Sequence, residues 1–596
     1  MFQSFDVTAR PEQGPGRLLA LRGEMTAREL DAFLVPRADA HQGEYVAPCD
    51  DRLAWLTGFT GSAGFCIVLA AQAGVFIDGR YRTQVKSQVD LDHFTPVSWP
   101  ETQPGSWLKE KLPSGSRVGF DAWLYTSGQL EKLTADLEGS GIALVPCDNL
   151  VDTIWADQPE PPMAAAKVHP LEFAGETHGD KRARLAKSLE DAGHIAAVLT
   201  LPDSICWLLN IRGADIPRNP VVQCFAVLHV TGAVALFIPP SKVQDVITHL
   251  GQDVSIHKPD EFLSYVNGLE GPVLVDKATI PVRVADQIET PVFGADPCAL
   301  PKACKNAAEI AGQVEAHLRD GAAIVELLTW LDAQPVGSLR ETQVVSQLEG
   351  FRRKDNALQD ISFETISGTG PNGAIMHYRV THETDAVLDD GHLLVLDSGG
   401  QYLDGTTDIT RTIAIGSPPE EAAMCFTRVL QGMIGMSRLR WPKGLAGRDI
   451  EMIGRLPLWL AGQDFDHGLG HGVGAYLSVH EGPQRLSKVS DVPLAPGMIL
   501  SNEPGYYREG AFGIRIENLL VVQEAAPLVG ADAHRKMLDW QTLTFAPIDK
   551  RLIVKDMLTP CDMVWLDTYH RDVLEKIGPR VTSGALAWLK EACAPL

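Results

Sequence analysis

The chain has 596 residues, which exceeds what one hydrophobic core supports and predicts about three or four domains. Its formal net charge of −24 argues against a nucleic-acid partner, because binding to phosphates depends on lysine and arginine side chains. Ten cysteines occur without a CxxC pair, the first residues lack the apolar core of a signal peptide, and no apolar run is long enough to span a membrane. We therefore expect a cytoplasmic enzyme that binds neither nucleic acid nor membrane.

The first half of the chain contains a diverged duplication. Each copy combines an amphipathic helix, predicted near residues 25–34 and 180–192, with a short apolar strand, a tryptophan-containing segment and two further apolar strands. A repeat of roughly 170 residues indicates tandem domains, because solenoid repeats are much shorter. The proline-rich stretch at 157–162 is the natural linker between the copies. We therefore predict α/β domains at residues 1–158 and 163–301.

A different pattern begins at residue 306. Apolar residues at helical spacing predict a long amphipathic helix over 308–331. Further on, the apolar run 393–397 ends in an aspartate, and the alternating segment 408–415 begins with one. These two segments predict a β-hairpin that brings the two aspartates together.

The last two parts of the chain are predicted as a third domain at 302–534 and a small extension at 535–596, which ends in two short helices. One helix of the extension carries an aromatic and aliphatic face at helical spacing: Trp565, Leu566, Tyr569 and Val573. Such a face must pack on the preceding domain or on another copy of the chain. We expect a homodimer through this face, and packing within the chain is the alternative.

Five residues in the last third of the chain form an oxygen-rich set of metal ligands. They are Asp397, Asp408, His471, Glu503 and Glu517, within the segments LLVLDSGG, TTDITRT, HGLGHGVG, NEPGYY and GIRIEN. Each of the acidic residues taken alone is more often a turn former or a cap, but a carboxylate that closes an apolar run is costly to bury unless it is paired or binds metal. Four carboxylates and one imidazole suffice for two divalent ions if some carboxylates bridge. Two metals about 3.5–4 Å apart that share a bridging hydroxide are a common device for amide hydrolysis, so the set predicts a metallohydrolase.

With these segments in place, the chain closely resembles the three-domain Xaa-Pro aminopeptidases (aminopeptidase P), which are pita-bread metallopeptidases. Besides the five metal-site segments, the resemblance includes GFTGSAG at 58–64, DGRY at 78–81, the run 305–321, NGAIMHY at 372–378 and VHEGP at 479–483. It implies two tandem creatinase-like α/β domains, then a pita-bread catalytic domain of the α+β class with a small C-terminal extension. It also implies a homodimer.

The resemblance assigns a role to each metal candidate. Asp397 would chelate one ion, and His471 and Glu503 would bind the other. Asp408 and Glu517 would bridge both. Oxygen-dominated coordination favours a hard ion such as Mn²⁺, and the resemblance points to the same metal. We therefore expect two Mn²⁺ per subunit, with Zn²⁺ or Co²⁺ as substitutes.

Three further histidines lie inside the motifs, although a lone histidine near apolar residues is usually structural. The resemblance implies that all three line the substrate site. His480 would stabilise the charge that develops on the scissile carbonyl oxygen. His377 would contact the region of the leaving proline nitrogen, and His467 would help to form the wall of the proline pocket.

Three more residues, together with the metal candidate Glu503, are candidates for roles near the reaction. Arg515 lies two residues before Glu517 on the same strand face, where it forms a salt bridge to a metal-binding carboxylate or contributes to catalysis. Tyr507 would orient the substrate or the surroundings of Glu503. Glu503 itself is the best candidate for moving a proton to the leaving nitrogen, and metal-bound water is the alternative. Arg80, in DGRY, is either an ordinary surface residue or, as in dimeric members of the family, a residue that reaches toward a substrate site.

The predicted function is removal of the N-terminal residue from peptides with proline in second position. Prolidase and methionine aminopeptidase share the five ligands, but the tandem N-terminal domains, VHEGP and the extension favour aminopeptidase P. Some proteins of this fold lack metal and act as binding modules for other proteins. The complete ligand set argues against that alternative and against metal-free creatinase chemistry.

Overall fold

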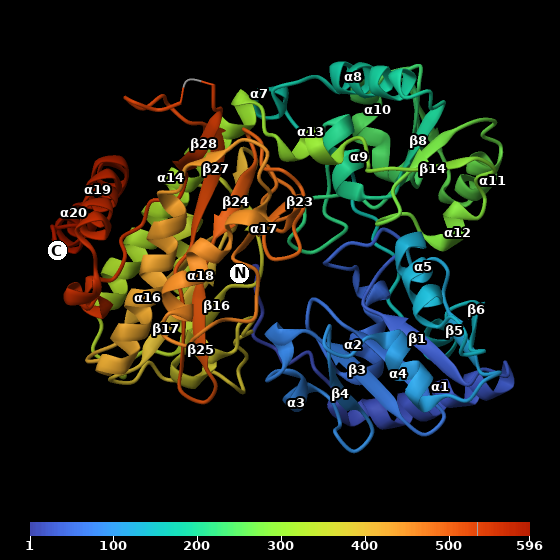
Figure 1. The fold of residues 1–596 in the computed structure, drawn as a ribbon, viewed down its shortest axis with the longest axis horizontal. Coiled ribbons are helices and arrows are strands. Elements are labelled where there is room, and N and C mark those ends of the chain that lie inside the picture. The colour runs from blue at the N-terminus through green and yellow to red at the C-terminus, as the bar shows by residue number, and fades with distance from the viewer. Residues whose placement is uncertain (533) are drawn as a thin grey trace. The chain divides into compact units, whose positions relative to one another are not determined.

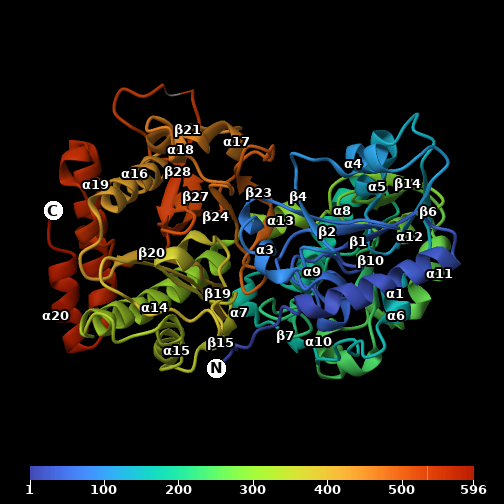
Figure 2. The same cartoon turned by 90° about the horizontal axis from the view of Figure 1, so that it is seen from below.

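The computed structural model describes residues 1–532 and 534–596 and divides into two compact units (Figures 1 and 2). The N-terminal unit comprises Thr8–Ala299, and the C-terminal unit comprises Met1–Val7 and Leu300–Leu596. The first seven residues, predicted to belong to the first domain, therefore pack with the C-terminal unit. Gln3, for example, accepts a hydrogen bond of 2.8 Å from the Thr365 backbone N–H. Among the helices of the described part, none is long and apolar enough to cross a membrane.

The N-terminal unit contains two six-stranded mixed sheets with the same topology. The first consists of β1 (Ala32–Pro36), β2 (Phe65–Leu69), β3 (Ala73–Ile77), β4 (Thr95–Ser98), β5 (Arg117–Phe120) and β6 (Ala143–Pro146). The second consists of β8 (Ala196–Leu199), β10 (Phe225–His229), β11 (Val234–Phe237), β12 (Val254–His257), β13 (Val273–Val275) and β14 (Pro291–Phe293). Their orders, β4-β3-β2-β1-β5-β6 and β12-β11-β10-β8-β13-β14, correspond strand for strand. The predicted duplication is confirmed.

Helices cover both faces of each sheet. The longer ones are α1 (Gly14–Ala27), α4 (Pro104–Lys111), α5 (Ser127–Asp136), α8 (His178–Asp191), α9 (Pro202–Leu209) and α11 (Phe262–Asn267). In the first domain, α1 packs on one face of the sheet, whereas α4 and α5 pack on the other. The helix predicted near 180–192 is confirmed by α8.

The helix predicted near residues 25–34 is wrong in position. Helix α1 ends at Ala27, the backbone of Glu29 turns through a positive φ of 55°, and β1 begins at Ala32. The physical reason lies in the apolar run that begins at Ala32. It is buried on both sides, which is typical of a central strand and cannot be distinguished from a helix by periodicity alone.

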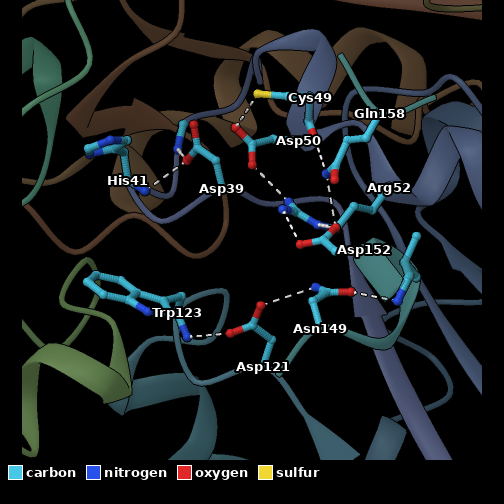
Figure 3. A network of polar contacts seen from close by, with 12 residues as sticks. Asp39, His41, Cys49, Asp50, Arg52, Asp121, Trp123, Asn149, Asp152 and Gln158 are labelled. Atoms are coloured by element: carbon cyan, nitrogen blue, oxygen red, sulfur yellow. Dashed lines mark hydrogen bonds and ion pairs between the residues drawn. The ribbon is translucent and has the colours of Figure 1, made fainter. Parts of the chain in front are cut away.

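A network of polar contacts in the N-terminal unit pairs several of its charged side chains (Figure 3). Arg52 donates hydrogen bonds of 2.6 Å to Asp152 and 2.8 Å to Asp50. Asp39, after β1, accepts a hydrogen bond of 2.9 Å from the side chain of Gln223, which precedes β10 in the second domain. Such contacts help to hold the two sheet domains together as one unit.

The C-terminal unit is built around a long helix and several antiparallel sheets. The longer helices are α14 (Ala307–Asp332), α15 (Glu341–Arg352), α16 (Glu420–Ser437), α18 (Met452–Trp459), α19 (Pro560–Ile577) and α20 (Ser583–Ala592). The smaller sheets contain β15 (Leu358–Ile361), β18 (Gly400–Tyr402) and β19 (Gly405–Thr406), then β16 (Ile366–Thr369), β17 (Leu393–Ser398) and β20 (Ile409–Ala414), and the hairpin β25 (Gly505–Arg508) and β26 (Phe512–Arg515). The six-stranded sheet contains β21 (Trp441–Pro442), β28 (Met537–Thr542), β27 (Asn518–Glu524), β24 (Ile499–Asn502), β22 (Gly470–Gly472) and β23 (Glu481–Leu486), in this order. The helix predicted over 308–331 is confirmed by α14, whose first turn is capped by Asn306.

The C-terminal helices α19 and α20 lie beside α14 (Figures 1 and 2). On α19, Leu566, Tyr569 and Val573 are buried in the same core as α16 and the six-stranded sheet. The apolar face that suggested a homodimer therefore packs within the chain. It gives no support for a dimer, and the oligomeric state stays a prediction.

Candidate metal centre

A pair of antiparallel strands positions the two aspartates. Asp397 lies near the end of β17 and pairs in register with Thr410 of β20, and Asp408 directly precedes β20. This is the predicted hairpin, with β18 and β19 inserted in its connection. Both aspartates are buried, with 8% and 4% of their surface exposed, respectively.

The other three metal candidates come from the six-stranded sheet. His471 is the middle residue of β22, which pairs with β24. Glu503 directly follows β24, and Glu517 directly precedes β27. Because these antiparallel strands pair Asn502 with Asn518, the two glutamates leave the sheet at the same end.

The side chains converge. Asp408, His471 and Glu517 each offer one ligand atom, and these atoms all lie within 4.8 Å of one another. The His471 Nε2 atom lies 3.5 Å from a carboxylate oxygen of Asp408 and 3.5 Å from one of Glu503. Such separations are long for strong hydrogen bonds. They fit ligands arranged around a cation, since ligand bonds of about 2.0–2.2 Å place neighbouring ligand atoms roughly 3 Å apart.

The tautomer of His471 also suits a metal ligand. Its Nδ1 atom lies 2.9 Å from the carbonyl oxygen of Gly472, which can only accept a hydrogen bond. Neutral His471 therefore carries its proton on Nδ1, and the lone pair of Nε2 faces the carboxylates. A backbone carbonyl that fixes the second ring nitrogen in this way is a recurrent feature of metal-binding histidines.

The buried carboxylates of the cluster repel one another, and a cation between them would balance their charge. Burial, together with the carboxylates of Asp397 and Glu503, raises the pKa of Asp408 well above its usual value. Burial and the Asp408 carboxylate do the same to the pKa of Glu517. One buried carboxylate oxygen on each of Asp397, Asp408 and Glu517 has no hydrogen-bond partner in the described part of the chain. Since an unpaired buried charge is costly, these residues fit a site for divalent cations.

A chain of hydrogen bonds links Asp397 to His467. Arg515 donates bonds of 2.6 Å to the carboxylate of Asp397 and 2.6 Å to the hydroxyl of Tyr507. The Tyr507 hydroxyl lies 2.9 Å from Nε2 of His467, whose Nδ1 lies 2.7 Å from the Gly468 carbonyl oxygen. Tyr507 therefore donates to His467. Arg515 forms the salt bridge that was one of its two predicted roles.

His480 lies against the metal candidates. Its ring meets the ring of His471 edge to face, with centroids 4.3 Å apart. His480 also influences the pKa of Glu503. Burial raises the pKa of Glu503, and His471, Arg515 and His480 oppose the rise. The imidazole of His480 is thus placed where it can act beside a bound metal.

His377 and Arg80 are the two other residues predicted to contact the substrate. His377 is half-buried and follows the short helix η6 (Gly370–Ala374), which packs against β26. Arg80 belongs to the N-terminal unit, where it donates hydrogen bonds of 3.0 and 2.7 Å to Asp78. The substrate roles of His377 and Arg80 remain predictions.

Two hydroxyl residues that support the metal candidates were not predicted. Thr410 donates a hydrogen bond of 2.9 Å to Glu517. Ser501 donates one of 3.1 Å to Glu503 and accepts one of 2.9 Å from the His471 backbone N–H. Thr410 lies two positions after Asp408, and Ser501 lies two positions before Glu503. This period-two spacing on a strand is the signal that could have found them.

The C-terminal extension also reaches the centre. The buried guanidinium of Arg411 on β20 donates to the backbone oxygen of Glu517, to the side chain of Asn518 and, at 2.8 Å, to the hydroxyl of Tyr569 on α19. The backbone of Ala546 donates to the same hydroxyl at 3.2 Å. The extension thus holds the strands that carry Asp408 and Glu517.

The chain matches four family models. Residues 302–524 match metallopeptidase family M24, and residues 536–596 match the C-terminal region of that family. Residues 17–154 and 157–309 each match a creatinase/prolidase N-terminal domain. The metal candidates all fall within the M24 match.

Curated and solved proteins are similar over nearly the full length. The chain is 37% identical to a probable Xaa-Pro aminopeptidase P of Neosartorya fischeri, over 97% of this chain and 92% of that protein. It is 38% identical to one of Coccidioides posadasii, over 99% and 95%. A solved X-prolyl aminopeptidase of Caenorhabditis elegans, described as a cytosolic enzyme with a di-nuclear active site, superimposes with a TM-score of 0.93 at 32% identity, covering 98% of this chain and all of that one.

Proposed function

The chain belongs to the Xaa-Pro aminopeptidase P family of M24 metallopeptidases, and from this premise we propose that it cleaves the bond between an N-terminal residue and a penultimate proline. The observation that carries the proposal is the convergence of Asp408, His471 and Glu517, with Glu503 and Asp397 beside them. An ordinary protein core does not gather four carboxylates around one imidazole without a cation. The substrates would be peptides with proline in second position.

The metal centre is proposed to hold two divalent ions, and the C. elegans relative is described as having a di-nuclear active site. Asp397 would bind one ion, His471 and Glu503 the other, and Asp408 and Glu517 both. Mn²⁺ is the proposed metal because four of the five ligands are carboxylates. When bound, the two ions would polarise the scissile carbonyl and activate a water nucleophile.

The remaining steps would fall to the protein's own side chains. The nitrogen of an X–Pro bond carries no hydrogen, so recognition cannot depend on an N–H donor there. His480 is proposed to donate a hydrogen bond to the carbonyl oxygen as negative charge develops on it. Glu503 would carry a proton to the leaving proline nitrogen. His467, oriented by Tyr507, would line the proline pocket together with His377.

Cleavage of three peptides tests the proposal. The enzyme loaded with Mn²⁺ should release arginine from Arg-Pro-Pro, and should leave the matched peptide Arg-Ala-Pro uncut. Gly-Pro addresses the alternative of a prolidase-type dipeptidase, for which the dipeptide would be the better substrate. Failure to cleave either proline peptide, with two metals bound, would favour the second alternative, a protein-binding module that has lost its activity.

A homodimer and a cytoplasmic location are also proposed. All ten cysteines are free, as expected in a reducing compartment. Helix α18 and its C-cap residue expose apolar side chains at the spacing of one helical face: Met452, Leu456, Trp459 and Leu460. A second copy of the chain would cover this face. Sedimentation should give twice the chain mass of 64.7 kDa, and Leu456→Glu should yield monomers. A wild-type monomer at micromolar concentration would contradict the dimer.

A further inference from the structure

A second cluster of buried charge lies next to His480. The carboxylate of Glu481 meets two ammonium groups, that of Lys302 at 2.7 Å and that of Lys305 in a closer contact. All three side chains are almost completely buried, with 6% or less of each exposed. The proposed reaction uses none of them. Lys305 and Glu481 are 176 positions apart in the chain, so the role of their buried pairing has to be explained.

The strand geometry connects this cluster to the metal centre. Glu481 is the first residue of β23, and its backbone pairs with Gly472, the residue that follows His471. Successive side chains on a strand point to opposite faces. The carboxylate of Glu481 is directed to the lysines, whereas the neighbouring His480 ring packs against His471.

The close pairing leaves no room for adjustment at Gly472. A Cβ atom on this glycine would lie 2.3 Å from the carbonyl oxygen of Glu481, so only glycine allows the two strands to approach in this way. The backbone on one side of His480 is therefore held against the strand of His471. The ion pairs of the Glu481 side chain with the two lysines hold the same backbone from the other side.

Glu481, Lys302 and Lys305 together form a clamp, and the two lysines fix the end of it that lies away from His480. The ammonium group of Lys305 also donates a hydrogen bond of 2.8 Å to the carbonyl oxygen of Lys302, and the Lys305 backbone N–H donates one of 2.9 Å to Gly497. Asn306, the next residue, caps α14. The clamp thus joins the start of the long helix to the segment VHEGP, two motifs far apart in the sequence.

We infer that Glu481, held by Lys302 and Lys305, is a positioning residue that fixes His480 over the metal centre. It touches neither substrate nor metal, and it acts on the reaction only through His480. Once the carboxylate is neutralised, the two buried ammonium groups lose their counter-charge, so they move toward solvent or lose protons. Either change weakens the ion pairs that hold Glu481 and with it the backbone at 480. The inference rests on the proposed function, because the role of His480 comes from it.

A double-mutant cycle tests the inference. Glu481→Gln should lower kcat on Arg-Pro-Pro by roughly 10-fold or more, the size of effect that supporting residues of metal sites have, while KM and the content of two metals change little. In a His480→Ala background, the same substitution should cost less than about twofold, because the residue through which it acts is gone. Equal losses in both backgrounds would overturn the inference.

Two controls separate positioning from general damage. Glu349→Gln changes another buried carboxylate of the same unit, which pairs with Arg353, and should leave kcat unchanged. Lys302→Met leaves one lysine on Glu481, so it is expected to fold even if Glu481→Gln does not, and the cycle can be repeated with it. An additive cycle for Lys302→Met would also contradict the inference.

Failure of the proposed function is recognised separately. If wild-type enzyme with two metals cleaves no proline peptide, the proposed function is wrong, whatever the variants do. The positioning of His480 can then be read from its imidazole ¹⁵N resonances, assigned by loss of the signal in His480→Ala. These resonances should shift in Glu481→Gln and stay unchanged in Glu349→Gln. Unshifted resonances in a folded Glu481→Gln protein would refute the positioning role.

Discussion

The C-terminal unit buries two clusters of charge, and they differ in how that charge is balanced. At Glu481, each carboxylate oxygen faces a lysine ammonium group. Around His471, by contrast, four carboxylates gather, and the nearby guanidinium of Arg515 forms its ion pair with the carboxylate of Asp397. Buried charge alone therefore does not identify a metal site. A metal site is identified by an excess of buried charge of one sign that the side chains of the protein do not compensate.

The largest effect should come from removing a central carboxylate. Asp408→Asn leaves the shape of the side chain but removes a charge that both ions would share. Activity should fall by more than roughly 100-fold, since even residues that only support metal ligands cost 10–100-fold. The matched control Asp404→Asn alters an aspartate that pairs with Arg319, outside the cluster. Two bound metals and more than a tenth of wild-type turnover in Asp408→Asn would count against the assignment.

Removal of the His480 imidazole should have the next largest effect. His480→Ala should lower kcat by roughly 10²–10³-fold, the usual cost of losing one donor to a developing oxyanion. KM should change less than kcat, because the hydrogen bond strengthens only as charge develops. Steady-state kinetics on Arg-Pro-Pro distinguish the two constants. A rise in KM alone would assign His480 to ground-state binding.

A smaller loss is expected along the hydrogen-bond chain from Asp397. Tyr507→Phe removes the hydroxyl between Arg515 and His467 and should lower kcat/KM by about 10-fold. Tyr506→Phe, at the adjacent position, is the control and should have little effect. Equal activities of the two variants would show that the chain from Arg515 to His467 does not contribute to catalysis.

The smallest effect concerns stability. Tyr569→Phe leaves Arg411 and the Ala546 backbone without the hydroxyl that they share. The free energy of unfolding should fall by about 1–3 kcal/mol, the usual cost of leaving buried polar groups without a partner. Urea denaturation of the metal-free chain measures it. An unchanged midpoint would indicate that the extension does not stabilise the strands of the metal centre.

The sequence predicts much of the metal centre because its residues lie within local motifs. The hairpin of β17 and β20 follows from an apolar run and an alternating segment, and the structure brings Asp408, His471 and Glu517 together as their motifs suggest. The duplicated sheets follow in the same way from repeated apolar strands. Each of these segments is a local pattern, whereas the convergence of segments that lie far apart in the chain was implied by the resemblance to a known family.

What the sequence could not reveal depends on contacts between distant residues. Lys305 and Glu481 are separated by 176 positions, and the local sequence around neither residue predicts their pairing. The face of α19 shows an apolar stripe but not what covers it, so packing within the chain could not be separated from a dimer. The misplaced helix near residues 25–34 has a different cause, because a fully buried strand and a buried helix have the same apolar pattern.

The pH dependence of the metal-free chain follows from the raised pKa values of Asp408 and Glu517. A carboxyl group whose pKa is higher in the folded than in the unfolded chain stabilises the fold at low pH, and this contribution is lost as the pH rises through the folded-state pKa. The metal-free chain should therefore melt at lower temperature as the pH rises above the usual carboxyl range. Bound Mn²⁺ should reverse that trend, because it takes the place of the protons.

Calorimetric titration of the metal-free chain with Mn²⁺ tests the central claim most directly. Two buffers of different ionisation heat, at the same pH near 6, would give both the number of ions and the number of protons released. We expect two ions per chain and a net release of protons, since the carboxyls must lose theirs to bind metal. Binding of fewer than two ions would contradict the assignment of this cluster as a two-metal site, and two ions bound without proton release would contradict the raised pKa values of its carboxyl groups.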